Sequence, residues 1–191
     1  MRFEDGTVMR LYRQTVEDFG LYTGMELSEE EMSRLREAAG AMSAKMRAVR
    51  IVAASNVSKK DLEQRLIHKG EDPRQAKEAV QWMTELKLVD DRATAEQVVA
   101  GCIRKGYGPA RARQALYEKK IPKEYWEDVL AEYPDQFSEI VDFLHNRLPS
   151  DADQKAVKKA VDALIRRGHS YSMIRRALEQ FSVETDAYPE G

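Results

Sequence analysis

One short pattern occurs three times and most constrains what this chain can fold into. The three copies are LIHKG at 66–70, CIRKG at 102–106 and LIRRG at 164–168. In each copy an isoleucine precedes two residues of basic type, histidine included, and a glycine follows them. Cations in the last turn and a glycine just beyond it are typical of a helix C-terminus. The pattern therefore predicts three helices that end in the same way.

The residues after each glycine repeat as well. Small or aliphatic residues follow in every copy at the same spacing: Ala76, Ala79 and Val80, then Ala112, Ala115 and Leu116, then Ile174, Ala177 and Leu178. This spacing lies on one face of an α-helix. A unit of helix, glycine turn and helix thus occurs three times, with an insertion at about 134–149 before the third copy. Units this small must pack against neighbours to bury their apolar faces, which predicts an extended all-α array.

Local signals mark further helix boundaries. Ser28-x-x-Glu31 is a capping-box pattern, and Asp72 followed by proline is typical of a helix start. Gly40 is predicted to end the helix that begins at Ser28. The preceding segment TVMRLYRQTV is rich in β-branched and aromatic residues and could form a short strand or two.

Composition bounds the class of protein and its compartment. Charged residues make up 34% of the chain and aromatic residues 8%, which suits solvated helices. The single cysteine cannot form an intramolecular disulfide. The first residues lack the apolar region of a signal peptide, and no apolar run is long enough to span a membrane. We therefore expect a soluble protein of the reducing cytoplasm with no membrane partner.

Residues that could carry chemistry are scattered along the chain. His68, His145 and His169 share no metal-ligand spacing, and a helix-end or surface role is expected for His68 and His169. Cys102 stands where the other two copies have leucine, which predicts a small buried hydrophobic side chain. The sequence therefore predicts neither an enzyme nor a bound metal or cofactor.

Charge is distributed unevenly although the formal net charge is only -2. Residues 101–125 hold seven basic and two acidic side chains, whereas 126–153 hold one basic and eight acidic side chains. Arg111 and Arg113 fall near the start of the helix expected after Pro109, where the helix dipole disfavours cations. No acidic residue lies within four positions of either arginine. We therefore expect both to face an external anion, either a phosphate or a partner's carboxylate.

The segment LVDDRATAEQVVAGCIRKGYGPARARQALYEKKIPKEYWEDVL, residues 88–130, resembles the central motif of the RecX family of bacterial RecA regulators. The motif combines a paired aspartate at a helix start, a Lys-Gly-Tyr-Gly-Pro turn and an Arg-rich helix. The segments SKKDLEQRLIHKGED at 58–72 and AVDALIRRGHSYSMIRRAL at 160–178 resemble the family's first and third repeats. Two departures are EKKIP, which lacks the glycine usual in the family, and His169, which replaces a phenylalanine.

The resemblance implies tandem three-helix repeats in an elongated, curved array. The expected organisation is an extension at 1–40 with short strands plus a helix, repeat 1 at 41–90, repeat 2 at 91–133, repeat 3 at 134–183 and a disordered tail at 184–191. It implies a non-enzymatic regulator of recombination and repair that binds the RecA–DNA filament and inhibits ATP hydrolysis and strand exchange. We expect a monomer with weak contact to single- or double-stranded DNA.

A strip of mostly basic residues is expected to bind the filament. They are Lys69, Arg104, Lys105, Tyr107, Arg111, Arg113, Lys119, Lys120, Arg166, Arg167, Arg175 and Arg176. Two other functions stay open. One is a stand-alone DNA-binding module of helix-turn-helix type, and the other is a helical-repeat scaffold for a different protein.

Overall fold

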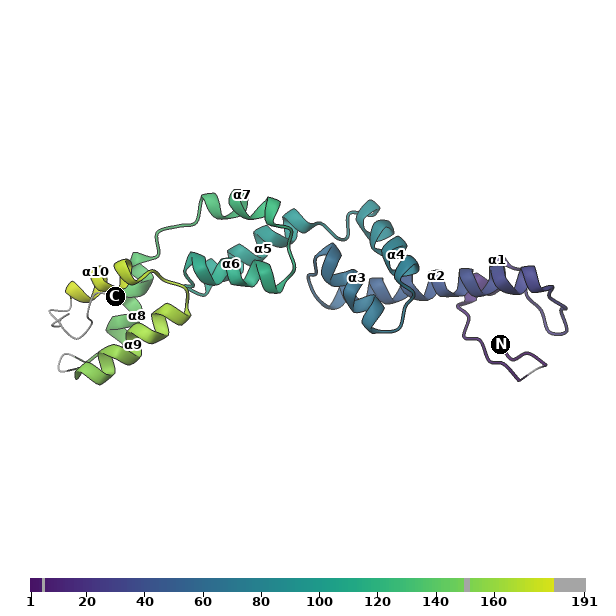
Figure 1. Ribbon diagram of the computed structural model, residues 1–191, viewed down its shortest axis with the longest axis horizontal. Coiled ribbons are helices and arrows are strands. Elements are labelled where there is room, and N and C mark those ends of the chain that lie inside the picture. The colour runs from purple at the N-terminus through teal and green to yellow at the C-terminus, as the bar shows by residue number, and fades with distance from the viewer. Residues whose placement is uncertain (5, 150–151, 181–191) are drawn as a thin grey trace. The chain divides into compact units, whose positions relative to one another are not determined.

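The computed structural model describes residues 1–4, 6–149 and 152–180, and this part of the chain is helical without a strand. The predicted all-α class is confirmed. The chain divides into two compact units, Met1–Asp90 (unit 1) and Asp91–Gly191 (unit 2), whose helices are labelled in Figure 1. The tail predicted to be disordered at 184–191 lies outside the described residues.

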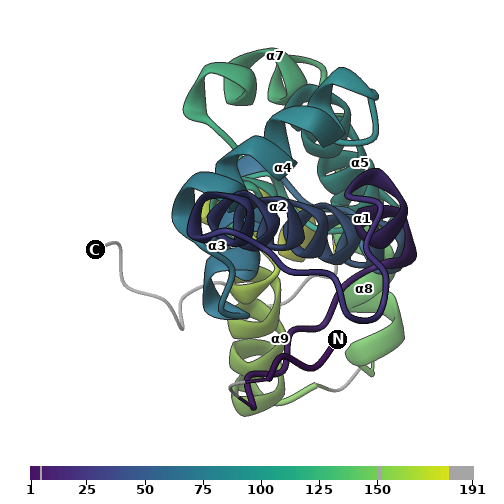
Figure 2. The same ribbon diagram turned by 90° about the vertical axis from the view of Figure 1, so that its right-hand side faces the viewer.

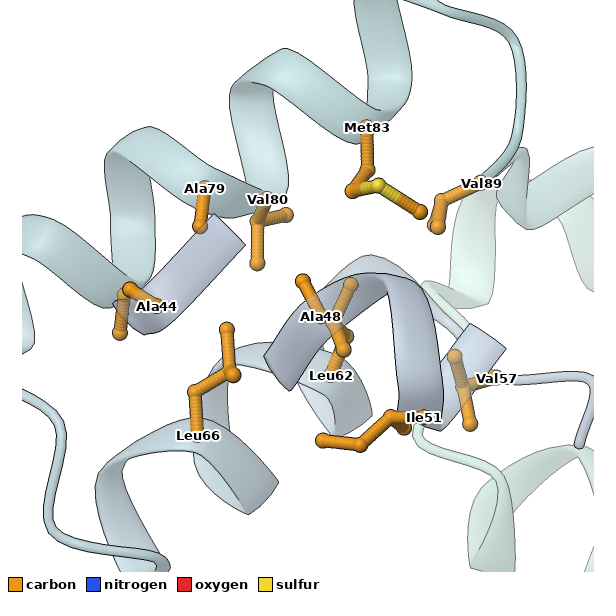
Figure 3. Close-up of a cluster of buried hydrophobic side chains, with 11 residues drawn as sticks. Ala44, Ala48, Ile51, Val57, Leu62, Leu66, Ala79, Val80, Met83 and Val89 are labelled. Atoms are coloured by element: carbon orange, nitrogen blue, oxygen red, sulfur yellow. The ribbon is translucent and has the colours of Figure 1, made fainter. Parts of the chain in front are cut away.

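Unit 1 is built around one long helix. Its helices are α1 (Arg13–Asp18), α2 (Glu29–Ala54), α3 (Lys59–His68) and α4 (Pro73–Glu85). Figure 2 looks nearly along α2, which contacts α1, α3 and α4. The core lies where α2, α3 and α4 meet, and Leu62, Leu66 and Met83 are almost fully buried in it (Figure 3). Ala44 and Ala48 of α2 are also buried there, and their small side chains allow close helix packing.

The helix starts in unit 1 follow the local sequence signals. The backbone N–H of Glu31 donates to Ser28 Oγ at 3.2 Å, and the backbone N–H of Ser28 donates to the Glu31 carboxylate at 2.8 Å. These two bonds are the predicted capping box. At α4 the Asp72 side chain accepts from two backbone N–H groups, and Pro73 is the first helical residue. Both predicted starts are confirmed.

Two expectations for the N-terminal region are wrong. Gly40 does not end a helix, because α2 continues through it to Ala54. Gly40 lies instead against the Gln75 side chain of α4, where an added Cβ would come within 2.4 Å of Gln75 Oε1. The end of the Gln75 side chain is flexible and can move aside, so this contact does not by itself require glycine. The expected short strands are reduced to one antiparallel bridge between Arg2 and Val8 within the described residues.

Unit 2 contains two groups of helices, each with its own buried cluster. Its helical segments are α5 (Asp91–Arg104), α6 (Pro109–Glu118), the 3-10 turn η1 (Lys123–Tyr125), α7 (Trp126–Ala131), α8 (Phe137–Arg147), α9 (Gln154–Arg166) and α10 (Tyr171–Glu179). Leu116 and Ile121 anchor the cluster of the first group. The stretch predicted as an insertion holds α8, whose Ile140 and Leu144 are fully buried against α9 and α10.

The three repeated glycines end their helices as predicted. Gly70, Gly106 and Gly168 have φ values of 89°, 62° and 88°, in the left-handed region that favours glycine. The next residue's N–H returns each time to a carbonyl five positions back, as in a Schellman motif. Lys87 and Lys120 adopt the same conformation, with φ values of 56° and 55°. The missing glycine of EKKIP is thus replaced by a lysine held in a left-handed backbone.

Candidate functional site

Two glycine turns meet in unit 2. The backbone N–H of Gly108 donates to the Arg167 carbonyl at 2.9 Å, and that of Ala110 donates to the Gly168 carbonyl at 3.3 Å. The backbones are so close that a Cβ added to Gly108 would lie 2.2 Å from the Gly168 oxygen. This contact, which we call the turn junction, brings the C-terminal ends of α5 and α9 together. The basic C-terminal ends of two of the repeated helices therefore lie next to each other.

The His169 side chain is buried at the turn junction and contacts one of its two turns. Its Nε2 lies 3.0 Å from the Gly106 carbonyl oxygen, which can only accept, so Nε2 carries the hydrogen. Its Nδ1 is buried without a hydrogen-bond partner among the described residues. Burial lowers the pKa of His169, and the charge of Arg167 acts in the same direction. The expected helix-end position is correct, but a surface role is wrong because the side chain is buried.

Aromatic side chains hold Tyr107 and Arg167 in place. The Tyr133 hydroxyl donates to the Tyr107 carbonyl at 2.6 Å, and burial raises the pKa of Tyr133 to about 12. The Arg167 guanidinium lies over the rings of Phe143 and Tyr107, at 4.8 Å and 5.9 Å from their centroids. Such cation–π contacts fix the side chain within the fold. Tyr107 and Arg167 are therefore structural parts of the turn junction.

Arg111 has a partner that contradicts its expected isolation. Its Nη1 and Nη2 donate to the Glu118 carboxylate at 3.0 Å and 3.4 Å, and these bonds lower the pKa of Glu118. Seven residues make two helical turns, so both side chains lie on one face of α6. Arg113 is exposed and has no ion pair within the described residues. The argument from an uncompensated cation near a helix N-terminus therefore applies to Arg113 and fails for Arg111.

The remaining predicted contact residues fall into two groups. Arg175 pairs with Glu179 at 3.7 Å, and Arg176 lies 4.6 Å from the ring centroid of Phe137. The half-buried Lys119 and Lys120 form the end of α6. By contrast, three other predicted residues lie close in sequence to the glycines of the turn junction, are exposed and make no ion pair in the described part of unit 2: Arg104, Lys105 and Arg166.

Unit 1 contains a second basic site, of which sequence analysis named only Lys69. Lys69 is exposed at the end of α3, and its carbonyl accepts from Arg47 Nη1 at 3.2 Å. A pocket of about 420 Å³ opens beside it, and Arg47, Arg50 and Arg65 also line this pocket. The spacing of these cations by three or four residues along α2 and α3 was the available signal. Only the tertiary packing of α2 on α3 brings the two pairs together.

Metal ligands and cysteine are two residue types that could carry chemistry. No group of three metal-ligating side chains occurs among the described residues. Cys102 is buried as predicted, and burial raises the pKa of its thiol, which disfavours the reactive thiolate. Nor does any helix in the described ranges have the length and apolar character to cross a membrane.

Comparison with known proteins supports one family throughout. Residues 90–130 match the family model described as RecX, second three-helix domain. A regulatory protein RecX from Xanthomonas axonopodis pv. citri is 31% identical over 136 residues, which cover 69% of this chain and 83% of that protein. A regulatory protein RecX from Vibrio parahaemolyticus is 28% identical over 140 residues, with coverage of 72% and 90%.

Solved structures agree in fold. A crystal structure of regulatory protein RecX aligns with a TM-score of 0.68 at 20% identity and covers 93% of this chain and 92% of its own. The crystal structure of RecX from Lactobacillus salivarius aligns with a TM-score of 0.64 at 22% identity, with coverage of 76% and 98%. With a helical fold shared over most of the length and a relative above 30% identity, this chain belongs to the RecX family of regulatory proteins.

Proposed function

We propose that this chain regulates the RecA recombinase by binding the RecA–DNA filament and lowering its rates of ATP hydrolysis and strand exchange. Membership of a family of regulatory proteins supports a regulatory role. The proposal assigns no reaction to the chain itself.

The observation that carries the proposal is the turn junction. It places Arg104, Lys105 and Arg166 around one contact between repeats, exposed and without an ion pair in the described part of unit 2. Cations left in this state can meet phosphates or acidic side chains of a partner without first breaking an internal bond. Arg111 and Arg167 are less suited to this role, because Glu118 and Phe143 already hold them.

The direct test measures ATP hydrolysis by RecA on single-stranded DNA at increasing ratios of this chain. We expect hydrolysis to slow as the ratio rises. Reversal of the junction cations, with Arg104→Glu, Lys105→Glu and Arg166→Glu combined, should raise the ratio needed for half-inhibition roughly tenfold. Hydrolysis that stays constant at every ratio would reject the proposed function.

A matched control separates the position of the charges from their number. Lys155, Lys158 and Lys159 are exposed lysines of α9 in the same unit. Reversing all three to glutamate changes the net charge by the same amount but leaves the turn junction intact. We expect this control to inhibit like the unaltered chain. Equal losses in both triple variants would show that the junction cations have no special role.

A further inference from the structure

The basic pocket of unit 1 is built from two helices that cross near their C-terminal ends. It is lined by seven residues of α2, α3 and their caps, and four of these are cations: Arg47, Arg50, Arg65 and Lys69. The remaining lining includes Ile51 and Ala54, which add an apolar wall. At about 420 Å³ the pocket is much larger than a single inorganic anion and can hold a nucleotide-sized group.

Two of the arginines are already held in position. Arg47 Nε pairs with Glu71 at 2.6 Å, and its Nη1 donates to the Lys69 carbonyl. Arg65 Nη2 pairs with Asp61 at 2.8 Å, and its Nη1 donates to Ser55 Oγ at 3.3 Å. A guanidinium has five N–H donors, so these contacts leave donors on each arginine for a further acceptor. A side chain that is fixed in advance loses less entropy when it binds an anion.

The charge of the pocket is not balanced from within. Glu71 and Asp61 are buried and offset one arginine each. Arg50 and the Lys69 ammonium make no ion pair in the described part of unit 1. The C-termini of α2 and α3 contribute about half a negative charge each, which leaves the pocket with about one net positive charge.

We infer that this pocket binds a phosphodiester of a nucleic-acid strand, with the phosphate held by the arginines and Lys69 and the sugar lying on the apolar wall. A phosphodiester carries one negative charge, which matches the charge left in the pocket, whereas a phosphomonoester carries close to two. This site lies entirely in unit 1 and is separate from the turn junction. It does not rest on the proposed function, because no recombinase enters its test.

The test measures binding of a fluorescent single-stranded oligothymidylate to the full chain as a function of salt. Arg50→Ala with Lys69→Ala removes only exposed side chains without ion pairs, so the fold should be kept and circular dichroism should not change. We expect affinity to fall roughly tenfold, because the two alanines of this variant cannot donate charged hydrogen bonds to the phosphate. The plot of log K against log salt should become less steep, by about 0.7 in slope for each phosphate that the protein no longer neutralises.

The matched control is Arg36→Ala with Lys77→Ala, which removes two exposed cations of unit 1 outside the pocket. This pair should bind like the unaltered chain. An oligonucleotide that carries neutral methylphosphonates should not compete, and inorganic phosphate should compete weakly. Crosslinking with 4-thiothymidine should label peptides within residues 47–69. Equal loss in both double variants, absence of binding at low salt, or crosslinks confined to unit 2 would each overturn the inference.

Discussion

Gly108→Ala should destabilise unit 2 although alanine fits the local backbone. Gly108 has a φ of -78°, which any residue adopts, so the substitution causes no backbone strain. The new Cβ would lie 2.2 Å from the Gly168 oxygen and 2.7 Å from the His169 nitrogen. Both are backbone atoms and cannot rotate away as a side chain could. The two turns must therefore separate by more than an ångström to reach an ordinary contact of about 3.4 Å.

Separation of the turns removes the bonds of the turn junction. These are the two backbone bonds from Gly108 and Ala110 and the His169 bond to the Gly106 carbonyl. At about 1 kcal/mol each, their loss lowers the free energy of unfolding by about 3 kcal/mol. The assay is urea unfolding followed by the fluorescence of Trp126. The chain has two tryptophans, so a Trp82→Phe background makes the signal specific to unit 2.

Gly101→Ala is a control that makes the same chemical change and is expected to have the opposite effect on stability. Gly101 lies inside α5, and the nearest atom to an added Cβ is a terminal nitrogen of Arg104 at 3.8 Å. Alanine should stabilise this helix by roughly 0.5–1 kcal/mol. If Gly108→Ala unfolds at the same urea concentration as the unaltered chain, the turn junction does not form and the reasoning is refuted.

Two further predictions concern a titrating group and a helix end. The pKa of His169 is lowered in the folded protein, so the unfolded chain takes up the proton more readily. The free energy of unfolding is therefore highest above the unfolded pKa of 6.5 and falls as pH drops from there through the folded pKa. Urea unfolding between about pH 7.5 and about pH 5.5 should therefore show a smaller loss of stability in His169→Phe than in the unaltered chain, and equal losses would contradict the assignment. Lys120→Gly should raise stability by roughly 0.5–1 kcal/mol because relief of the left-handed backbone exceeds the entropy cost of glycine, whereas Lys119→Gly, at φ -81°, should lower it. Thermal unfolding of both lysine variants checks this prediction. A lower unfolding temperature in both variants would count against strain at Lys120.

Features decided within one or two helical turns could be predicted from the sequence. The capping box at Ser28, the glycine helix ends and the burial of Cys102 all follow from residues close together in the chain. The apolar stripes after the glycines also hold, since only Ala115 of the predicted positions is not buried. In these cases the local chemistry and the packed fold favour the same conformation.

Features that depend on distant segments could not be predicted. Gly108 and Gly168 are sixty residues apart, and nothing local indicates that their backbones touch. Gly40 is misleading because a glycine can also lie in the interior of a helix, as it does here in α2. The Arg111–Glu118 pair spans two helical turns, which long side chains can bridge although the usual spacing of helical ion pairs is three or four residues. The pocket of unit 1 requires two helices to cross, and sequence spacing alone does not give that crossing.

The length of α2 has a consequence for any shortened form of the protein. The helix has 26 residues and spans about 39 Å at 1.5 Å per residue. Its first half carries the fully buried Leu35 and contacts α1, and its second half carries Ala44 and Ala48 of the core. A chain that starts after residue 40 would therefore begin in the middle of α2. It would lack the Ser28 cap, and the new end of the helix would fray. The N-terminal segment and the first helical core therefore share one continuous helix, and a cut at residue 40 would divide it.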